Sequence, residues 1–327
     1  MAYKRFQNTV TESKLMLPLS AIVVGASCYM AGLVSEGLWI QAVCLLVSSI
    51  LFLELNNINQ LLRVVSQSTP SLFLLLVSSS IFIFPQLETG IIQLCMIALY
   101  FMLFHCSQHH ESPGWVFYGF FCLGLASMVF VQVMYFVPLL WILMGTCLRA
   151  LNSKTFFASL MGIITPYWIA SPLILYFFGI EKVLGHFHAL GEFHQLGDYS
   201  MIGEHEWVGI GWTAFLALVG IIHYARRGYQ DKIRTRLLHE IFIVMDLATI
   251  LFLALQPQHY IILLSIMIVN TSPLIAHYLT LTHTWLTNIS FHTIILITLL
   301  IIAYHIWIPS SSFLSAMVMQ ACSYLPL

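Results

Sequence analysis

Long apolar runs separated by short polar turns make up nearly the whole chain. About 20 apolar residues cross a bilayer, and fewer suffice where a segment is short or partly re-entrant. The runs are 15–34, 38–55, 70–85, 90–105, 115–131, 133–148, 155–178, 208–224, 239–256, 258–280 and 287–307. This pattern predicts an all-α, polytopic integral membrane helix bundle of about 10–11 transmembrane helices. We expect a single domain over residues 1–327.

The 115–148 region leaves three arrangements open. Each half is short for a full crossing, and the link around Gln132 contains no turn residues. Two tilted spans, a re-entrant hairpin or one long bent helix would all satisfy the pattern. The choice decides on which side of the membrane every later loop lies.

Composition supports a membrane environment. Of the 327 residues, 60% are hydrophobic and 8% are charged, whereas a soluble domain carries about 25% charged residues. The net charge of −1 gives no field that would attract nucleic acid. The seven cysteines are scattered singly, so no disulfide framework is indicated. Neither a Walker loop nor a dinucleotide fingerprint is present.

Lysine and arginine sort onto one side of the predicted bundle. With the N-terminus in the cytoplasm and the spans alternating, eleven of the 12 Lys and Arg residues face the cytoplasm, and Lys182 alone faces outward. This agrees with the positive-inside rule. It also requires an even number of crossings within 115–148, because Arg149 and Lys154 would otherwise lie outside. The last stretch, 312–327, is too short to span and is expected along the outer interface.

Three segments are expected outside the bilayer. Residues 56–69 are polar, with apolar positions at helical spacing, and predict a short cytoplasmic surface helix. Residues 180–207 form the longest outer loop. Residues 225–238 form a basic cytoplasmic connector that is expected to contact anionic headgroups.

Histidines offer one candidate chemistry, because 14 of them are many for this length. His105, His109 and His110 form an H-x3-HH pattern on the predicted cytoplasmic face, and it resembles one histidine box of the membrane di-iron desaturases. Imidazole is the commonest transition-metal ligand. An alternative function is therefore a histidine- and iron-dependent membrane oxygenase acting on an apolar substrate, such as a carotenoid or an acyl chain. The chain has no second HH pair, and the simpler interpretation is interfacial packing.

The outer loop offers a second candidate site. His186 and His188 form a His-x-His pair that, together with nearby carboxylates, predicts a site for zinc or another divalent ion. The carboxylates that would meet a headgroup, a sugar or a partner are Glu192, Asp198, Glu204 and Glu206. The simpler interpretation is an acidic, solvated loop.

Asp246 is the most unusual single residue. It lies about eight residues into its span, roughly 12 Å below the inner boundary at about 1.5 Å per residue. A carboxylate near a helix centre costs about 2.5–3.5 kcal/mol to insert, so it should face the bundle interior and have a partner. Asn270 and His292 reach a similar depth. Asp246 is either a polar clamp between these helices or the protonatable group of a proton-coupled transporter.

Several stretches resemble an uncharacterised family of polytopic inner-membrane proteins of Bacteroidota. They are Gly114–Ile169, the run from Lys232 to Arg236 that continues through QPQHYIILLSIMIVNTSPLIAHYLTL at 256–281, and the polar turn Leu55–Pro70. The likeness covers about two thirds of the chain through apolar motifs. It implies a multi-pass protein of the bacterial inner (cytoplasmic) membrane with a place in the cell envelope.

A second likeness is to the multi-span glycosyltransferases that use polyprenyl-phosphate sugars. Their GLALG…PLLWLL…LR helix pair is similar to residues 124–127, 138–141 and 148–149 of this chain. Those enzymes keep an essential carboxylate in the first outer loop, and the likeness makes Glu36 the catalytic candidate here beside Asp246. The loop, Ser35–Gly37, is too short for the jutting helix of that family. The expected role is therefore in the cell envelope, with a lipid or a lipid-linked glycan as substrate and with no cofactor assigned.

Overall fold

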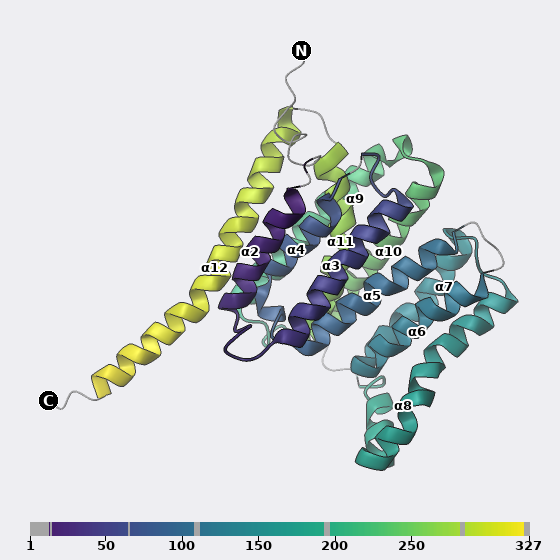
Figure 1. Cartoon of the computed structure of the whole chain (residues 1–327), viewed down its shortest axis with the longest axis horizontal. Coiled ribbons are helices and arrows are strands. Elements are labelled where there is room, and N and C mark those ends of the chain that lie inside the picture. Colours follow the sequence, from purple (N-terminus) through teal and green to yellow (C-terminus); the bar gives the residue numbers. More distant parts are fainter. Residues whose placement is uncertain are drawn as a thin grey trace.

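The protein is a bundle of α-helices joined by short turns (Figure 1). The structure, a computed structural model, describes residues 13, 15–64, 66–107, 112–192, 197–281 and 285–323. Within these ranges it contains α-helices and short 3-10 helices and no strand. Each predicted apolar run overlaps one of the helices α2 to α12, which confirms the all-α membrane bundle.

Seven of these helices are long and apolar enough to cross a membrane, and the other four are shorter. The α-helices are α2 (Met16–Met30), α3 (Trp39–Asn59), α4 (Ser68–Ser79), α5 (Leu87–His105), α6 (Pro113–Val129), α7 (Val137–Thr146), α8 (Ser153–His188), α9 (Glu204–Arg227), α10 (Ile233–Leu255), α11 (Tyr260–Leu281) and α12 (Trp285–Ser323). The 3-10 helices are η1 (Ile81–Ile83), η2 (Val131–Phe136), η3 (Gly228–Gln230) and η4 (Pro257–His259).

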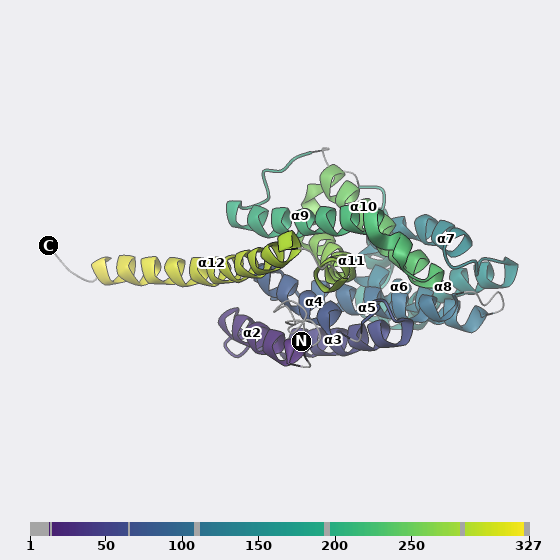
Figure 2. The same ribbon diagram turned by 90° about the horizontal axis from the view of Figure 1, so that it is seen from above.

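Helix α11 forms the centre of the bundle. It packs against α4, α5, α9 and α10, and Figure 2 shows it surrounded by other helices. Of its 22 residues, 19 are buried, including Asn270, Thr271 and His277. A helix that is covered all round must satisfy its polar side chains inside the protein. The polar chemistry of the bundle therefore gathers around α11.

The 115–148 region forms two antiparallel helices. Helix α6 runs to η2, and α7 then returns along α8, where Trp141 Nε1 donates a hydrogen bond to Ser159 Oγ at 3.0 Å. Helix α6 packs along α8 as well, with the Ser127 and Tyr167 hydroxyls 2.9 Å apart. Of the three arrangements considered, the structure excludes one long bent helix, because α6 and α7 run in opposite directions. It keeps Arg149 and Lys154 at the same end as Arg63.

Helix α8 reverses direction at Gly179, which has φ +74° and ψ 171°. An L-residue is strained in this conformation, whereas glycine adopts it readily. As a result, His186 Nε2 lies 3.4 Å from the Tyr167 hydroxyl, although 19 residues of straight helix would span roughly 28 Å. Residues 180–188 of the predicted outer loop are thus helical and fold back over the end of α6.

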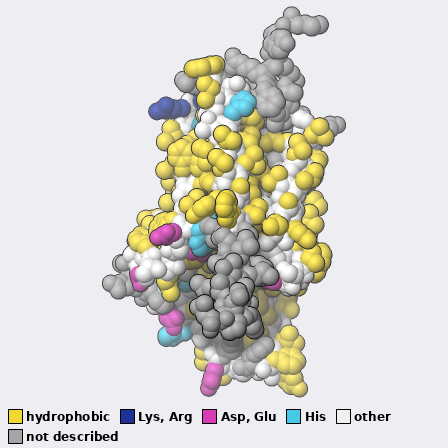
Figure 3. Space-filling model, turned by 90° about the vertical axis from the view of Figure 1, so that its left-hand side faces the viewer, with side chains coloured by type: hydrophobic (Ala, Val, Ile, Leu, Met, Phe, Trp, Pro, Cys, Tyr) yellow, Lys and Arg dark blue, Asp and Glu magenta, His cyan; other side chains and the backbone are white. Residues whose placement is uncertain are grey.

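The two ends of the bundle carry opposite charge. We call "basic end" the end with Arg63, Arg149, Lys154 and residues 226–236, and "acidic end" the end with Glu36, Glu88 and residues 188–192 and 197–206. Figure 3 shows one face, where apolar side chains cover the zone between Lys or Arg above and Asp and Glu below, with His side chains on both sides of it. This charge distribution matches the alternation of spans predicted from the sequence.

Two local expectations were wrong. The stretch 56–69 is not a surface helix, because α3 continues to Asn59 and α4 begins at Ser68. Asn56 and Asn59 are buried: Asn56 donates a hydrogen bond to the Ser66 carbonyl in this connection, and Asn59 donates one to the Leu55 carbonyl within α3. The C-terminal stretch does not form a separate interfacial segment, because α12 continues to Ser323 and projects beyond the other helices in Figure 1.

We predict that the basic end faces the cytoplasm and the acidic end faces outward. Tyr229 at the basic end is 69% exposed and Met201 at the acidic end is 68% exposed, so a cysteine at either position is accessible to reagents. A membrane-impermeant maleimide should label Met201→Cys in intact spheroplasts and Tyr229→Cys only after permeabilisation. The unsubstituted protein gives the background, and the reverse pattern would contradict the orientation.

Candidate functional site

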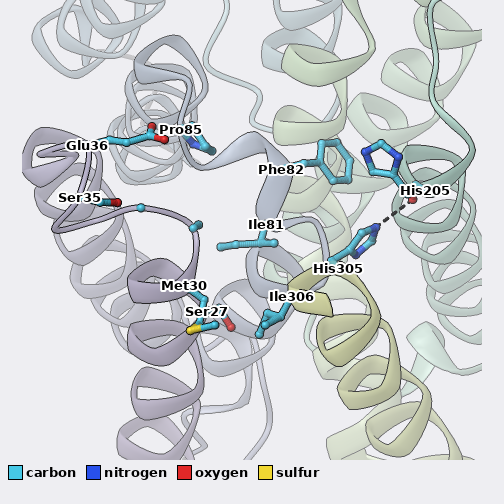
Figure 4. Close-up of a pocket in the computed structure, with 12 residues that line it drawn as sticks. Ser27, Met30, Ser35, Glu36, Ile81, Phe82, Pro85, His205, His305 and Ile306 are labelled. Atoms are coloured by element: carbon cyan, nitrogen blue, oxygen red, sulfur yellow. Dashed lines mark hydrogen bonds between the residues drawn. The ribbon is translucent and has the colours of Figure 1, made fainter. Parts of the chain in front are cut away.

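A cavity of about 290 Å³ lies at the acidic end, between the loop after α2, η1, α9 and α12 (Figure 4). Met30, Ile81 and Ile306 form apolar parts of its wall. Glu36 and His205 contribute polar groups. The cavity therefore combines apolar walls with a carboxylate and imidazole. It lies where the apolar middle zone of the bundle meets the acidic end.

The short loop after α2 directs Glu36 toward this cavity. Gly32 has φ +98°, and the Glu36 amide donates a hydrogen bond to the Gly32 carbonyl at 2.9 Å. A Cβ on Gly32 would lie 3.2 Å from the Glu36 side chain, so the carboxylate folds over the bare glycine. The predicted catalytic candidate of the first outer loop thus lines a cavity, although no jutting helix carries it.

His305 closes the opposite side of the cavity. Its Nε2 lies 2.9 Å from the His205 carbonyl oxygen. Because a carbonyl can only accept, Nε2 carries the proton and Nδ1 presents a lone pair. That Nδ1 atom is buried and has no hydrogen-bond partner among the described residues. The Phe82 ring packs edge-on against both imidazoles, with centroid distances of 6.3 Å to His205 and 5.5 Å to His305.

The four carboxylates proposed for substrate binding do not gather at one point. Glu192 is exposed and pairs with His188 at 3.0 Å. Hydrogen bonds from the side chain and the amide of Ser200 hold the pKa of Asp198 below its ordinary value. Glu204 is exposed on the first turn of α9, and Glu206 accepts a hydrogen bond from the Gly203 amide at 2.7 Å. Glu192, Asp198 and Glu206 thus each bond to a residue within four positions along the chain.

His186 and His188 face different partners. His186 Nε2 donates to the Ser127 carbonyl at 3.0 Å, whereas His188 is exposed and contacts Glu192. Side chains two apart on a helix diverge. The structure therefore does not bring this pair together around a common point.

The histidine box of the cytoplasmic face is only partly described. His105 Nδ1 lies 2.7 Å from the Phe101 carbonyl, and its ring stacks on Trp115 with a centroid distance of 4.6 Å. His109 and His110 lie outside the described residues. In the part of the chain that is described, no group of three or more His, Cys, Asp or Glu residues could hold a metal ion.

Asp246 is fully buried where α10 meets α11. Its Oδ2 accepts a hydrogen bond from Thr271 at 3.0 Å, whereas Oδ1 has no partner among the described residues. The neighbouring Asn270 accepts a hydrogen bond from Tyr100 at 2.6 Å, and its amide nitrogen is likewise unpartnered. The expected contact with His292 is not formed, because that side chain is exposed on α12. The polar clamp joins α10, α11 and α5.

A buried ion pair at the basic end was missed by the sequence analysis. Asp231, between α9 and α10, accepts hydrogen bonds from His277 at 2.8 Å and from Arg63. Burial alone would raise the pKa of the Asp231 carboxyl, but the hydrogen bonds from His277 and Arg63 outweigh it and hold this pKa below its ordinary value. The only feature of the sequence that could have indicated this ion pair is Asp231, the single carboxylate within the strongly basic connector 225–238.

A set of aromatic and imidazole rings continues from this ion pair into the bundle. Tyr224 stacks on His239 with a centroid distance of 4.7 Å, and His277 lies 5.3 Å from His239 and 5.4 Å from His223. The Tyr224 hydroxyl, His239 Nε2 and His277 Nδ1 are buried without partners among the described residues. Buried groups of this kind are normally satisfied by water or a ligand.

Comparison with known proteins gives no relative for this chain: no family model, curated protein or solved structure matches it.

We predict that Asp231→Asn destabilises the protein at neutral pH. The folded-state pKa of Asp231 lies below the unfolded value of about 3.9, so its stabilisation is fully present above that pH and is lost as the pH falls through the folded pKa. The loss at pH 7 should be about 2 kcal/mol, mostly from the buried His277 bond, because Arg63 is partly exposed and screened.

Thermal unfolding of the detergent-solubilised protein measures this effect. The melting temperature of Asp231→Asn should fall below that of wild type at pH 7, and the gap should close in strong acid. Asp198→Asn, at an exposed carboxylate with a single local partner residue, is the matched control and should leave the melting temperature unchanged. A gap that persists at every pH would show that the Asp231 charge is not the cause.

Proposed function

We propose that this integral membrane protein binds the headgroup of a lipid or of a lipid-linked glycan at its acidic end, as part of the cell envelope of a bacterial inner membrane. One observation carries the proposal: the carboxylate of the first acidic-end loop, Glu36, lines the cavity with His205 and His305 above apolar walls. The likeness of two helices to polyprenyl-phosphate-sugar glycosyltransferases supports the same class of substrate.

The polarity of the cavity fits an amphiphile. Its apolar wall includes Met30 from α2 and Ile306 from α12, two helices that otherwise expose apolar side chains to the bilayer. Small-molecule sites are typically apolar cavities with a few polar groups that set orientation. An acyl or prenyl chain would lie along α2 and α12, and the polar head would meet Glu36.

The chemistry of the polar groups favours hydroxyl-bearing headgroups. An ionised carboxylate only accepts hydrogen bonds, so Glu36 suits the hydroxyls of a sugar or glycerol. A carboxylate that faces imidazoles across a cavity could also act as a general base on a hydroxyl acceptor, which is the step that a glycosyl transfer would need.

Binding of a polyprenyl-linked sugar tests this proposal. Glu36→Gln keeps the shape of the side chain and removes its charge, so it should weaken binding of a photo-crosslinkable polyprenyl-phosphate sugar about tenfold, as expected when a charged hydrogen bond is lost. Glu88→Gln is the matched control, because Glu88 is an exposed carboxylate of the same end and does not line the cavity.

The same variants should be compared in cells. Envelope glycans should change in Glu36→Gln, and separately in a variant with the histidines and carboxylates of 186–206 replaced. Unchanged glycan profiles in both, together with unaltered crosslinking of Glu36→Gln, would remove the support for a glycan or lipid-linked substrate.

A proton-coupled role is the second candidate, and the unpartnered Oδ1 of Asp246 favours it. An ionisable residue inside the membrane is costly and is usually retained for function. His239 lies seven residues before Asp246 on α10, and His277 lies six after Thr271 on α11, so polar groups continue along both helices toward the basic end. Such a series of groups could pass a proton between Asp231 and Asp246.

Infrared difference spectroscopy after a pH jump measures proton exchange at Asp246 directly. We expect a carboxyl band that responds to pH and disappears in Asp246→Asn, while Glu240→Gln on the same helix keeps it. If the spectrum of a folded Asp246→Asn variant matches that of wild type, Asp246 is a structural clamp and the proton-coupled role is excluded.

A further inference from the structure

A second cavity, of about 700 Å³, lies at the basic end of the bundle. One wall is the last turn of α3 with Asn56, Asn57 and Gln60, and the other is the start of α10. Arg63 and Lys232 also line it. This cavity is at the opposite end of the molecule from the Glu36 cavity and shares no residue with it.

The charge of the basic-end cavity is positive after internal pairs are counted. Asp231 is its one carboxylate, and this group is already bonded to His277 and Arg63. The Arg63 guanidinium uses Nε for Asp231 and one terminal nitrogen for Gln230, at 3.2 Å, so other N–H groups remain available. Among the described residues, Lys232 Nζ donates one hydrogen bond, a long one of 3.3 Å to Gln60 Oε1.

The start of α10 adds to the attraction for anions. No side chain caps the helix, whose N-cap residue is Lys232, and Thr235 of its first turn lines the cavity. The positive end of the helix dipole and the free amides of a first turn bind phosphate groups well. Arginine forks and lysine ammonium groups are the side chains most often used for the same purpose.

We infer that the basic-end cavity binds a phosphate group, and that its source is the phosphodiester headgroup of an anionic phospholipid. The cavity combines Lys232, the remaining N–H groups of Arg63, a helix N-terminus and amide side chains, which is the chemistry that recognises phosphoryl oxygens. Its position at the end of α3 and α10 is the level at which the apolar zone of the bundle ends, so lipid headgroups reach it. Basic cavities between membrane helices bind such headgroups in other proteins.

This site would hold a structural or regulatory lipid rather than the substrate proposed for the acidic end. A headgroup bound between α3 and α10 would bridge two helices that Arg63 and Asp231 already join. It would therefore stabilise the connection between the first half of the chain and the α9–α11 region. The inference stands whether or not Glu36 binds a lipid-linked substrate.

The test compares lipid binding by full-length variants. Purified protein is delipidated in neutral detergent and titrated with phosphatidylglycerol, with phosphatidylcholine or with inorganic phosphate. Native mass spectrometry counts the bound lipid molecules. Thermal unfolding measures how much each ligand stabilises the protein. Lys232→Gln removes one exposed cation of the cavity and leaves the Arg63–Asp231 pair intact. Arg226→Gln is the matched control, because Arg226 is exposed on the same connector and does not line the cavity.

Wild type should retain phosphatidylglycerol in preference to phosphatidylcholine and should be stabilised by it. Lys232→Gln should weaken this binding about fivefold, as expected for one cation near an anionic headgroup, while Arg226→Gln should bind like wild type. Stabilisation by inorganic phosphate without retained phosphatidylglycerol would identify a soluble phosphate compound and overturn the lipid assignment. If wild type bound phosphatidylglycerol and phosphatidylcholine equally, the proposed phosphate site would be overturned. The same conclusion would follow if Lys232→Gln and Arg226→Gln weakened phosphatidylglycerol binding equally.

Discussion

The structure depends on burying α11 on every side while it carries polar side chains. Lipid offers no hydrogen bonds, so each buried polar group must find its partner within the protein. Thr271 meets Asp246, Asn270 meets Tyr100, and His277 meets Asp231. These contacts bring α5, α10 and the α9–α10 connector against one helix, and they set the register in which the apolar side chains pack.

The same constraint explains why the two ends of the bundle differ chemically. Helix ends leave amides and carbonyls unpaired, and the turns that join them must carry polar groups at the level of the lipid headgroups. At the basic end these turns gather arginine and lysine around a cavity with an uncapped helix. At the acidic end they gather a carboxylate and imidazoles around a smaller, partly apolar cavity. We therefore propose an anion as the ligand of the first cavity and a hydroxyl-bearing headgroup as the ligand of the second.

Much of the fold could be predicted, because hydrophobic runs and charge asymmetry are local properties of the chain. The burial of Asp246 beside Thr271 could be anticipated in part, since its depth required an interior partner. The ion pair of Arg63 with Asp231 could not, because 168 residues separate the two and no local pattern links them. The reversal at Gly179 was missed for a related reason, because a glycine in an apolar run does not reveal whether its φ is positive.

The sequence by itself determined that this is a polytopic helical membrane protein, where its helices lie and which ends carry positive charge. These follow from the free energy of transferring each segment to lipid, which depends on composition and hardly on neighbours. Only the tertiary structure decided which polar groups meet. It turned Glu36 into the wall of a cavity and separated His186 from His188, because the position of a side chain in three dimensions depends on how distant helices pack.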